Sequence, residues 1–175
     1  MKTTFVRKFF AVLLTGALAC LLCLAAFADN LASYAEDGDM DYISLYRVTV
    51  DPREDGSADI TYEIDWQVID GGRDDYLSWV KIGLANAHVD ELTALTDTIS
   101  DIEYSGDGGS YAKITFAEPY YAPDIAAEIG AQSRVHFAFS VHQSHLFRLN
   151  PDGTADFAFT PGWFDELSVE KMEVR

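Results

Sequence analysis

The sequence is poor in cysteine, with two in 175 residues. Cys20 and Cys23 both lie in an apolar segment near the N-terminus, so their Cys-x-x-Cys spacing reflects that segment and does not predict a redox or metal site. Residues 29–175 contain no cysteine. This excludes a disulfide framework and a thiolate metal site there, and the chain must be stabilised by a hydrophobic core.

Positive charge is also scarce: 12 Lys and Arg face 29 Asp and Glu, which gives a formal net charge of −17. The first 28 residues hold three of the bases and no acid, so the rest of the chain is three charges more negative. A field of this sign repels nucleic acid and anionic membrane surfaces. It is compatible with a basic partner, with divalent cations, or simply with a solvated acidic surface.

Long apolar runs are absent after residue 28. Before it, Lys2, Arg7 and Lys8 precede the apolar stretch 9–24, which is followed by Ala26-Phe27-Ala28. A basic start, a short apolar stretch and an A-x-A site predict a secretory signal peptide over residues 1–28, cleaved after Ala28. An uncleaved membrane anchor is the alternative, although the run is close to the lower limit for a membrane span.

Sustained helical periodicity is missing as well, whereas a period of two is clear. In ADITYEIDWQVI, residues 58–69, six apolar residues alternate with five polar ones from Ala58 to Val68, and the apolar Ile69 follows. A strand places the apolar set on one face, which predicts a sheet with one buried side and one acidic, solvated side. Six apolar positions therefore form the predicted core of this strand: Ala58, Ile60, Tyr62, Ile64, Trp66 and Val68.

Further strand patterns surround this segment and are separated by turns rich in Gly, Pro and Asp. Residues 29–41 are predicted to be a flexible acidic leader, and the remainder a single β-domain over residues 42–175. We expect an all-β, antiparallel, immunoglobulin-like sandwich of about eight or nine strands, with a barrel or jelly roll as the alternative. The strands are expected at 43–50, 58–69, 76–84, 99–104, 111–117, 134–141, 146–149, 155–159 and 167–174.

Two segments between these strands are less regular. In residues 85–98 the apolar positions Val89, Leu92 and Leu95 have helical spacing, so one or two helical turns are plausible there. Residues 124–132 could hold a short helical turn. The sequences DGSADI (55–60) and DGTADF (152–157) are alike, which we attribute to shared turn chemistry at the start of a strand.

Acidic turns form the first candidate site. Asp51, Asp55 and Asp59 surround one turn, and calcium prefers six to eight oxygen ligands of this kind. No twelve-residue EF-hand pattern is present. Calcium is therefore a possible cofactor, and ordinary surface charge is the alternative explanation.

Two carboxylates on one strand form the second candidate. Glu63 and Asp65 point to the same side about 7 Å apart, a separation that falls in the range used by glycosidases. They lie in the middle of a strand with no sign of a cleft. No catalytic residue is therefore predicted with them, and a glycoside hydrolase remains an alternative to a non-catalytic protein.

Aromatic residues in predicted loops form the third candidate, a ligand-binding set. Tyr120 and Tyr121 lie between two prolines, and Trp163 and Phe164 follow Pro161-Gly162. Exposed aromatic rings can stack on sugars or anchor a protein partner. These four residues indicate a carbohydrate-binding domain as a second alternative function.

The segments TVDPREDGSADITYEIDW and DGTADFAFTPGWFDELSVEKMEV resemble the N-terminal extracellular domains of uncharacterised bacterial membrane proteins. The resemblance implies an envelope location and a binding or scaffolding role, and it transfers no catalytic residue. We therefore expect a secreted or envelope-exposed binding module whose partner is a protein or polysaccharide of the cell envelope. We expect no nucleic-acid partner, and the mature domain is not expected to span the membrane. The sequence does not determine the oligomeric state.

The calcium hypothesis has a direct test in thermal unfolding with EDTA, calcium or zinc. A ligand at a hundred times its dissociation constant adds about 2.7 kcal/mol to the free energy of unfolding, which raises the midpoint by several degrees. If the acidic turns form a site, we expect this rise with calcium and not with zinc. An unchanged midpoint would contradict the calcium site.

Overall fold

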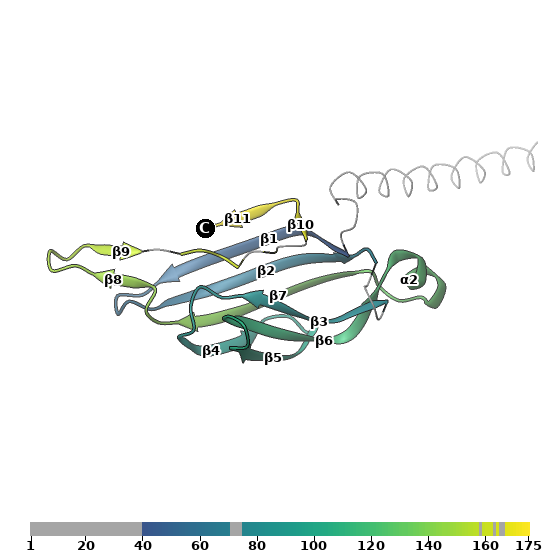
Figure 1. Cartoon of the computed structure of the whole chain (residues 1–175), viewed down its shortest axis with the longest axis horizontal. Coiled ribbons are helices and arrows are strands. Elements are labelled where there is room, and N and C mark those ends of the chain that lie inside the picture. The colour runs from purple at the N-terminus through teal and green to yellow at the C-terminus, as the bar shows by residue number, and fades with distance from the viewer. Residues whose placement is uncertain (1–39, 71–74, 158, 163, 165–166) are drawn as a thin grey trace, which may run out of the picture. The chain divides into compact units, whose positions relative to one another are not determined.

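A computed structural model of the chain describes residues 40–70, 75–157, 159–162, 164 and 167–175 (Figure 1). The predicted signal peptide and all of the leader except its last two residues lie outside this part. Asp41 already belongs to the first strand, so the β-domain begins one residue before the expected start.

The described residues form two packed sheets and a separate hairpin. Sheet A has the strand order β10-β1-β2-β7-β4, with β11 also beside β1, and sheet B has the order β3-β6-β5. The strands are β1 (Asp41–Pro52), β2 (Ala58–Val68), β3 (Tyr76–Gly83), β4 (Val89–Ala94), β5 (Ile99–Ser105), β6 (Tyr111–Tyr121), β7 (Arg134–Gln143), β8 (Phe147–Leu149), β9 (Ala155–Phe157), β10 (Ser168–Val169) and β11 (Met172–Val174), with one short helix, α2 (Pro123–Ile129). The all-β, mostly antiparallel sandwich is thus confirmed. The described residues contain more strands than the expected eight or nine, because β4 lies in a region where no strand was expected and the region 167–174 is divided into β10 and β11.

Strand β2 lies at the centre of sheet A. It pairs with β1 from Ala58 to Val68 and with β7 from Ala58 to Gln67, both antiparallel. All six predicted inward residues are at most 5% exposed. The alternation in the sequence therefore predicted both the strand and its buried face correctly.

The core lies between the two sheets and is rich in aromatic rings. Tyr62 of β2 stacks on Phe139 of β7, with ring centroids 4.7 Å apart and planes at 4°. Across the layers, Phe116 of β6 meets Phe137 of β7 edge-on at 5.2 Å. Such pairs add about 0.5–1.5 kcal/mol to the stabilisation from burial of their area.

The two similar turn sequences adopt the same local structure. In the β1–β2 turn, Ser57 donates from its backbone N and its Oγ to Asp55 Oδ1, at 3.0 and 2.6 Å. In the β8–β9 turn, Thr154 donates in the same way to Asp152, at 3.0 and 2.7 Å. A glycine with positive φ sits between each pair. Shared turn chemistry thus accounts for the sequence likeness.

The helical turns considered for residues 85–98 are wrong, because this region contains strand β4 at the edge of sheet A. The β4–β7 register shifts between Val89 and Glu91, so a bulge inserts one residue. Val89 lies opposite Gln143 and Leu92 opposite Val141, both inward-facing positions. A bulge thus brings residues three apart onto one face and imitates helical spacing. The short helix expected near 124–132 is present as α2.

The C-terminal strands depart from the antiparallel expectation. The region 167–174 contains β10 and β11, and both pair with β1 in the parallel direction. Before them, Phe159, Phe164 and Leu167 pack against the core. At Gly83 and Gly162 two backbones touch, since a Cβ on Gly162 would lie 2.6 Å from the Gly83 carbonyl oxygen. Glycine is therefore required where this segment passes the edge of sheet B.

Hairpin β8–β9 and helix α2 lie at opposite ends of the β-domain (Figure 1). Among the residues that the structure describes, no helix is long and apolar enough to cross a membrane.

Asp41 is a buried carboxylate at the start of β1, only 8% exposed. Burial, assisted by the nearby Asp70 carboxylate, raises the pKa of Asp41 to about 6. Because the folded pKa exceeds the unfolded value, the free energy of unfolding falls as pH rises through the window of about 4 to 6. At neutral pH the ionised group therefore destabilises the fold.

We expect Asp41→Asn to increase the free energy of unfolding at pH 7.5 by about 1–3 kcal/mol, since one pKa unit corresponds to about 1.36 kcal/mol. Urea unfolding at pH 4, 5, 6 and 7.5 measures both this gain and the slope with pH. Asp107→Asn, in the exposed β5–β6 turn, is the matched control. A variant at Asp41 with the same pH slope as the unaltered protein would contradict the prediction.

Candidate functional site

The outer face of sheet A carries the polar side chains of β2, and the register places a base opposite each of the two carboxylates considered for the hydrolase alternative. Glu63 lies opposite Arg47 of β1, and Asp65 lies opposite His136 of β7. Arg47 Nη1 is 2.6 Å from Glu63 Oε2, and His136 Nδ1 is 2.6 Å from Asp65 Oδ1. Both carboxylates thus take part in cross-strand pairs on an open sheet face.

The ion pair between Arg47 and Glu63 extends to strand β11 on the other side of β1. Arg47 Nε donates to Glu173 Oε2 at 2.8 Å, and Lys171 and Arg175 also pair with Glu173. Hydrogen bonds from Lys171 and then Arg47 hold the pKa of Glu173 at about 2. Glu173 therefore stays ionised at all physiological pH values, and it connects the last strand electrostatically to β1.

A second charged cluster lies where β2 begins. His142 Nδ1 is 2.5 Å from Asp59 Oδ1, and Arg53 pairs with Asp59 Oδ2. The His142 hydrogen bond and then that of Arg53 lower the pKa of Asp59, and Asp59 in turn raises the pKa of His142. An open hollow of about 480 Å³ adjoins this cluster, lined by Arg53, Glu54, Asp55, Ser57, Asp59 and His142.

Two of the three predicted metal ligands, Asp55 and Asp59, line this hollow, and Asp51 does not. Asp55 accepts two hydrogen bonds from Ser57, both oxygens of Asp59 have basic partners, and Asp51 Oδ2 lies 3.9 Å from Arg53 Nη2. No group of three or more His, Cys, Asp or Glu side chains positioned for a metal occurs among the described residues. Calcium binding stays a prediction, and an ion here would have to displace Arg53 from Asp59.

The predicted ligand-binding aromatics do not come together as an exposed set. The loop expected for Tyr120 and Tyr121 is wrong, since β6 continues to Tyr121 and pairs there with β3. The β3–β6 pairing is irregular between Thr115 and Tyr120, and Pro119 lies in the resulting bulge of β6. Proline has no backbone N–H to donate, and at a bulge no hydrogen bond to the neighbouring strand is lost. Tyr120 is buried and packs edge-on against Phe116 at 5.5 Å, while Tyr121 lies beside Tyr76 with ring centroids 5.6 Å apart.

Phe164 is also used in packing. Its ring meets Tyr46 at 5.3 Å and Trp66 at 5.7 Å, both edge-on, so it covers the core at the open side of the sandwich. Trp163 lies outside the described residues. Of the four predicted aromatics, Tyr121 is the one that the structure describes as partly exposed and not packed into the core.

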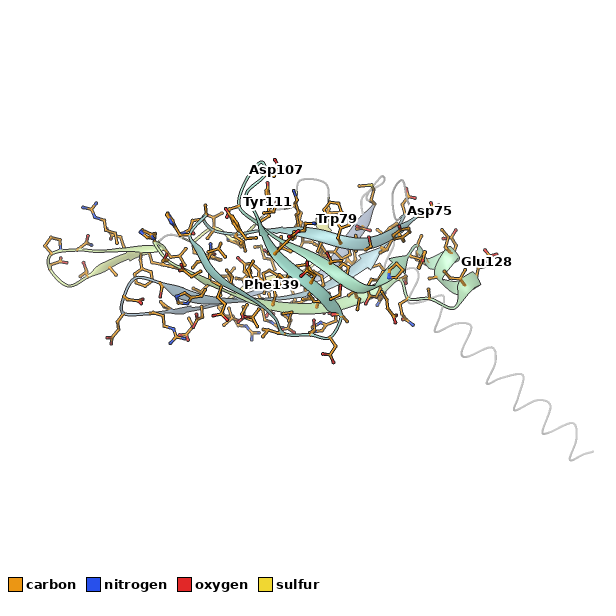
Figure 2. All side chains as sticks on the ribbon, turned by 90° about the horizontal axis from the view of Figure 1, so that it is seen from below. Asp75, Trp79, Asp107, Tyr111, Glu128 and Phe139 are labelled. Atoms are coloured by element: carbon orange, nitrogen blue, oxygen red, sulfur yellow. The ribbon has the colours of Figure 1, made fainter. Side chains whose placement is uncertain are left out.

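The outer face of sheet B carries an aromatic and lysine surface that the sequence reasoning missed. Trp79 of β3 is 52% exposed, and Lys81 Nζ lies 5.6 Å from the ring centroid of Tyr111 on β6. Trp79 and Tyr111 lie on the outer side of this sheet, whereas Phe139 lies between the sheets (Figure 2). The alternation within β3 could have predicted this surface. Val80 and Ile82 are buried, so the residues that alternate with them, such as Trp79 and Lys81, face outward.

No known family model and no curated protein matches this chain. Similar solved structures include two of an M1 zinc metallopeptidase mutant from Deinococcus radiodurans, one of them bound to a Tyr-Ser-Ala substrate. Their TM-scores are 0.35 and 0.36 at 10% identity, over 63% of this chain and 22% of the peptidase. This chain thus spans less than a quarter of the peptidase's length, and a likeness of this size carries no argument about function.

The contact between Asp59 and His142 is expected to make the stability of the protein depend on the protonation of His142. Protonated His142 is stabilised by Asp59, so the pair's contribution to stability is present at low pH and is lost as pH rises through the raised pKa of His142. We expect Asp59→Asn to bring the pKa of His142 down toward its ordinary value, as measured by NMR of the imidazole resonances. Asp156→Asn removes the carboxylate at the equivalent position of the DGTADF sequence and is the control. An unchanged His142 titration in Asp59→Asn would contradict this coupling.

Proposed function

We propose that this protein is an exported, non-catalytic binding module that acts at the bacterial cell envelope. The observation that carries the proposal is the open outer face of sheet B, where Trp79 is half exposed in the middle of a strand. A large aromatic side chain in such a position contributes little to the core, and exposed aromatics of this kind are typical of ligand or partner contacts. The basic, apolar and A-x-A segments of residues 1–28 support export.

The hydrolase alternative is less well supported by the geometry. A glycosidase needs one carboxyl group kept protonated and a cleft that encloses the sugar. Glu63 and Asp65 instead lie on an open sheet face, paired with Arg47 and His136. The role that fits them is to fix the register of β1, β2 and β7.

The immunoglobulin-like character of the sandwich is also part of the proposal. The layout of seven strands, β1-β2-β7-β4 facing β3-β6-β5, has the four-plus-three division of a constant-type immunoglobulin domain. The connectivity differs, because the strand beside β2 comes last of the seven along the chain. The resemblance to envelope-protein domains agrees with this kind of sandwich presented outside the cell.

The proposal is tested by expressing the full chain in a bacterium. We expect the exported product to begin at Asp29 by mass spectrometry and to co-sediment with an insoluble envelope fraction. The double variant Glu63→Gln with Asp65→Asn should bind as well as the unaltered protein, since exposed ion pairs contribute about 0–1 kcal/mol to stability. Cytoplasmic retention, or no binding to any envelope fraction, would contradict the proposal.

A further inference from the structure

The outer face of sheet B is defined by strand register. Trp79 lies opposite Thr115, Lys81 opposite Lys113, and Gly83 opposite Tyr111. The intervening residues of both strands, among them Val80, Ile82 and Ile114, are buried in the core. The outward side chains therefore form one continuous surface over β3 and β6, which we call the Trp79 face: Trp79, Lys81, Tyr111, Lys113 and Thr115. The neighbouring strand β5 adds two exposed carboxylates beside it, Asp101 opposite Thr115 and Glu103 opposite Lys113.

The two lysines of the Trp79 face are directly opposite each other, an arrangement that destabilises a sheet because the charges repel. Lys113 is compensated by Glu103 of β5, whose Oε1 lies 2.7 Å from the Lys113 ammonium. Lys81 has no carboxylate within ion-pair distance among the described residues, and its ammonium instead lies over the Tyr111 ring. Lys81 is therefore the lysine of this face that remains available to an anionic ligand.

Basic residues are rare enough for this placement to be informative. Lys81, Lys113 and Lys171 are the three lysines after residue 28, and two of them share the Trp79 face. The acidic outer face of sheet A lies on the other side of the core, about 10 Å or more away. At about 0.15 M salt that distance exceeds the Debye length of about 8 Å, so the charges of sheet B itself dominate here. Lys81 on β3 lies two strand spacings, about 10 Å, from the β5 carboxylates Asp101 and Glu103, so they screen it less than they screen Lys113.

The aromatic rings mark the two ends of the lysine pair. Trp79 and Gly83 are four residues apart on β3, and Tyr111 lies opposite Gly83, so the rings are separated by about 13 Å along the strands. The Tyr111 ring is held in place because it packs on Gly109, where a Cβ would approach it to 2.6 Å. A chain-like ligand with flat rings and negative charge between them fits this order of side chains.

We infer that the Trp79 face binds an acidic polysaccharide, with one sugar ring stacked on Trp79 and a uronate carboxylate paired with Lys81. The Lys81 ammonium then moves off the Tyr111 ring, which it covers in the free protein, and a second sugar stacks there. Lys113 provides a second cation next to Lys81 when Glu103 turns away toward solvent, since the Glu103 side chain is 55% exposed. The inference rests on the proposed binding role and names its ligand class. A neutral polysaccharide would satisfy the rings but leave Lys81 without a partner.

Affinity electrophoresis and calorimetry of the full chain with polygalacturonate and with neutral dextran test the inference at about 0.15 M salt. We expect binding to polygalacturonate and at least tenfold weaker binding to dextran. Trp79→Ala and Lys81→Gln should each weaken polygalacturonate binding at least tenfold without changing the unfolding midpoint, because both side chains are outside the core. Phe157→Ala, another half-exposed aromatic, and Lys171→Gln, a lysine already paired with Glu173, are the matched controls and should bind normally.

The remaining outcomes separate this inference from the proposed function. Equal binding to dextran, or full polygalacturonate binding by Trp79→Ala and Lys81→Gln, would overturn the acidic-polysaccharide assignment. Envelope binding that persists in both variants would also overturn it, yet would leave the binding role intact. A protein that binds no envelope fraction at all contradicts the binding role itself.

Discussion

Burial of one face of β2 is the constraint on which the rest of the structure depends. Because side chains alternate with a period of two, a shift of one residue in its pairing would turn Tyr62, Ile64 and Trp66 toward water and bury the acids between them. The register that satisfies the core is therefore also the one that places Glu63 beside Arg47 and Asp59 beside His142. The ion pairs on the outer face of sheet A follow from core packing, and they add specificity to a register that hydrophobic burial already selects.

The same rule gives the two outer faces of the sandwich different chemistry. Sheet A exposes acids that are mostly matched by Arg or His on the neighbouring strand. Sheet B exposes Trp79, two lysines and, on β5, Asp101 and Glu103. Lys113 pairs with Glu103, whereas the ammonium of Lys81 lies over a tyrosine ring. The core keeps these faces apart by at least the spacing of two packed sheets, so each surface presents its own charge to the solvent at physiological ionic strength. A strongly acidic protein can in this way carry an aromatic surface on which Lys81 has no carboxylate partner among the described residues.

The sequence allowed correct prediction wherever one local pattern decided the structure. The β1–β2 and β5–β6 hairpins and helix α2 were predictable from alternation and turn residues. The β4 strand was not, because its bulge gives Val89 and Leu92 a helical spacing that only pairing with β7 explains. Parallel pairing of β10 and β11 depends on contacts more than a hundred residues apart. For the site, acidity and loop position drew attention to turns, whereas exposure of Trp79 depends on which face of β3 the core covers.

Parallel pairing of β11 with β1 also has a mechanical consequence. The two strands run in the same direction, so the start of β1 and the end of β11 lie at opposite ends of one ladder. Hydrogen bonds from Tyr46 to the Lys171 carbonyl and from Arg175 to the Val48 carbonyl cross this ladder at 2.8 and 2.9 Å. A pull on residues 41 and 175 would load these bonds in shear, so that they share the force and break together. Resistance to forced unfolding depends on the rate of unfolding. Loading these hydrogen bonds in shear slows unfolding under force without requiring a larger core.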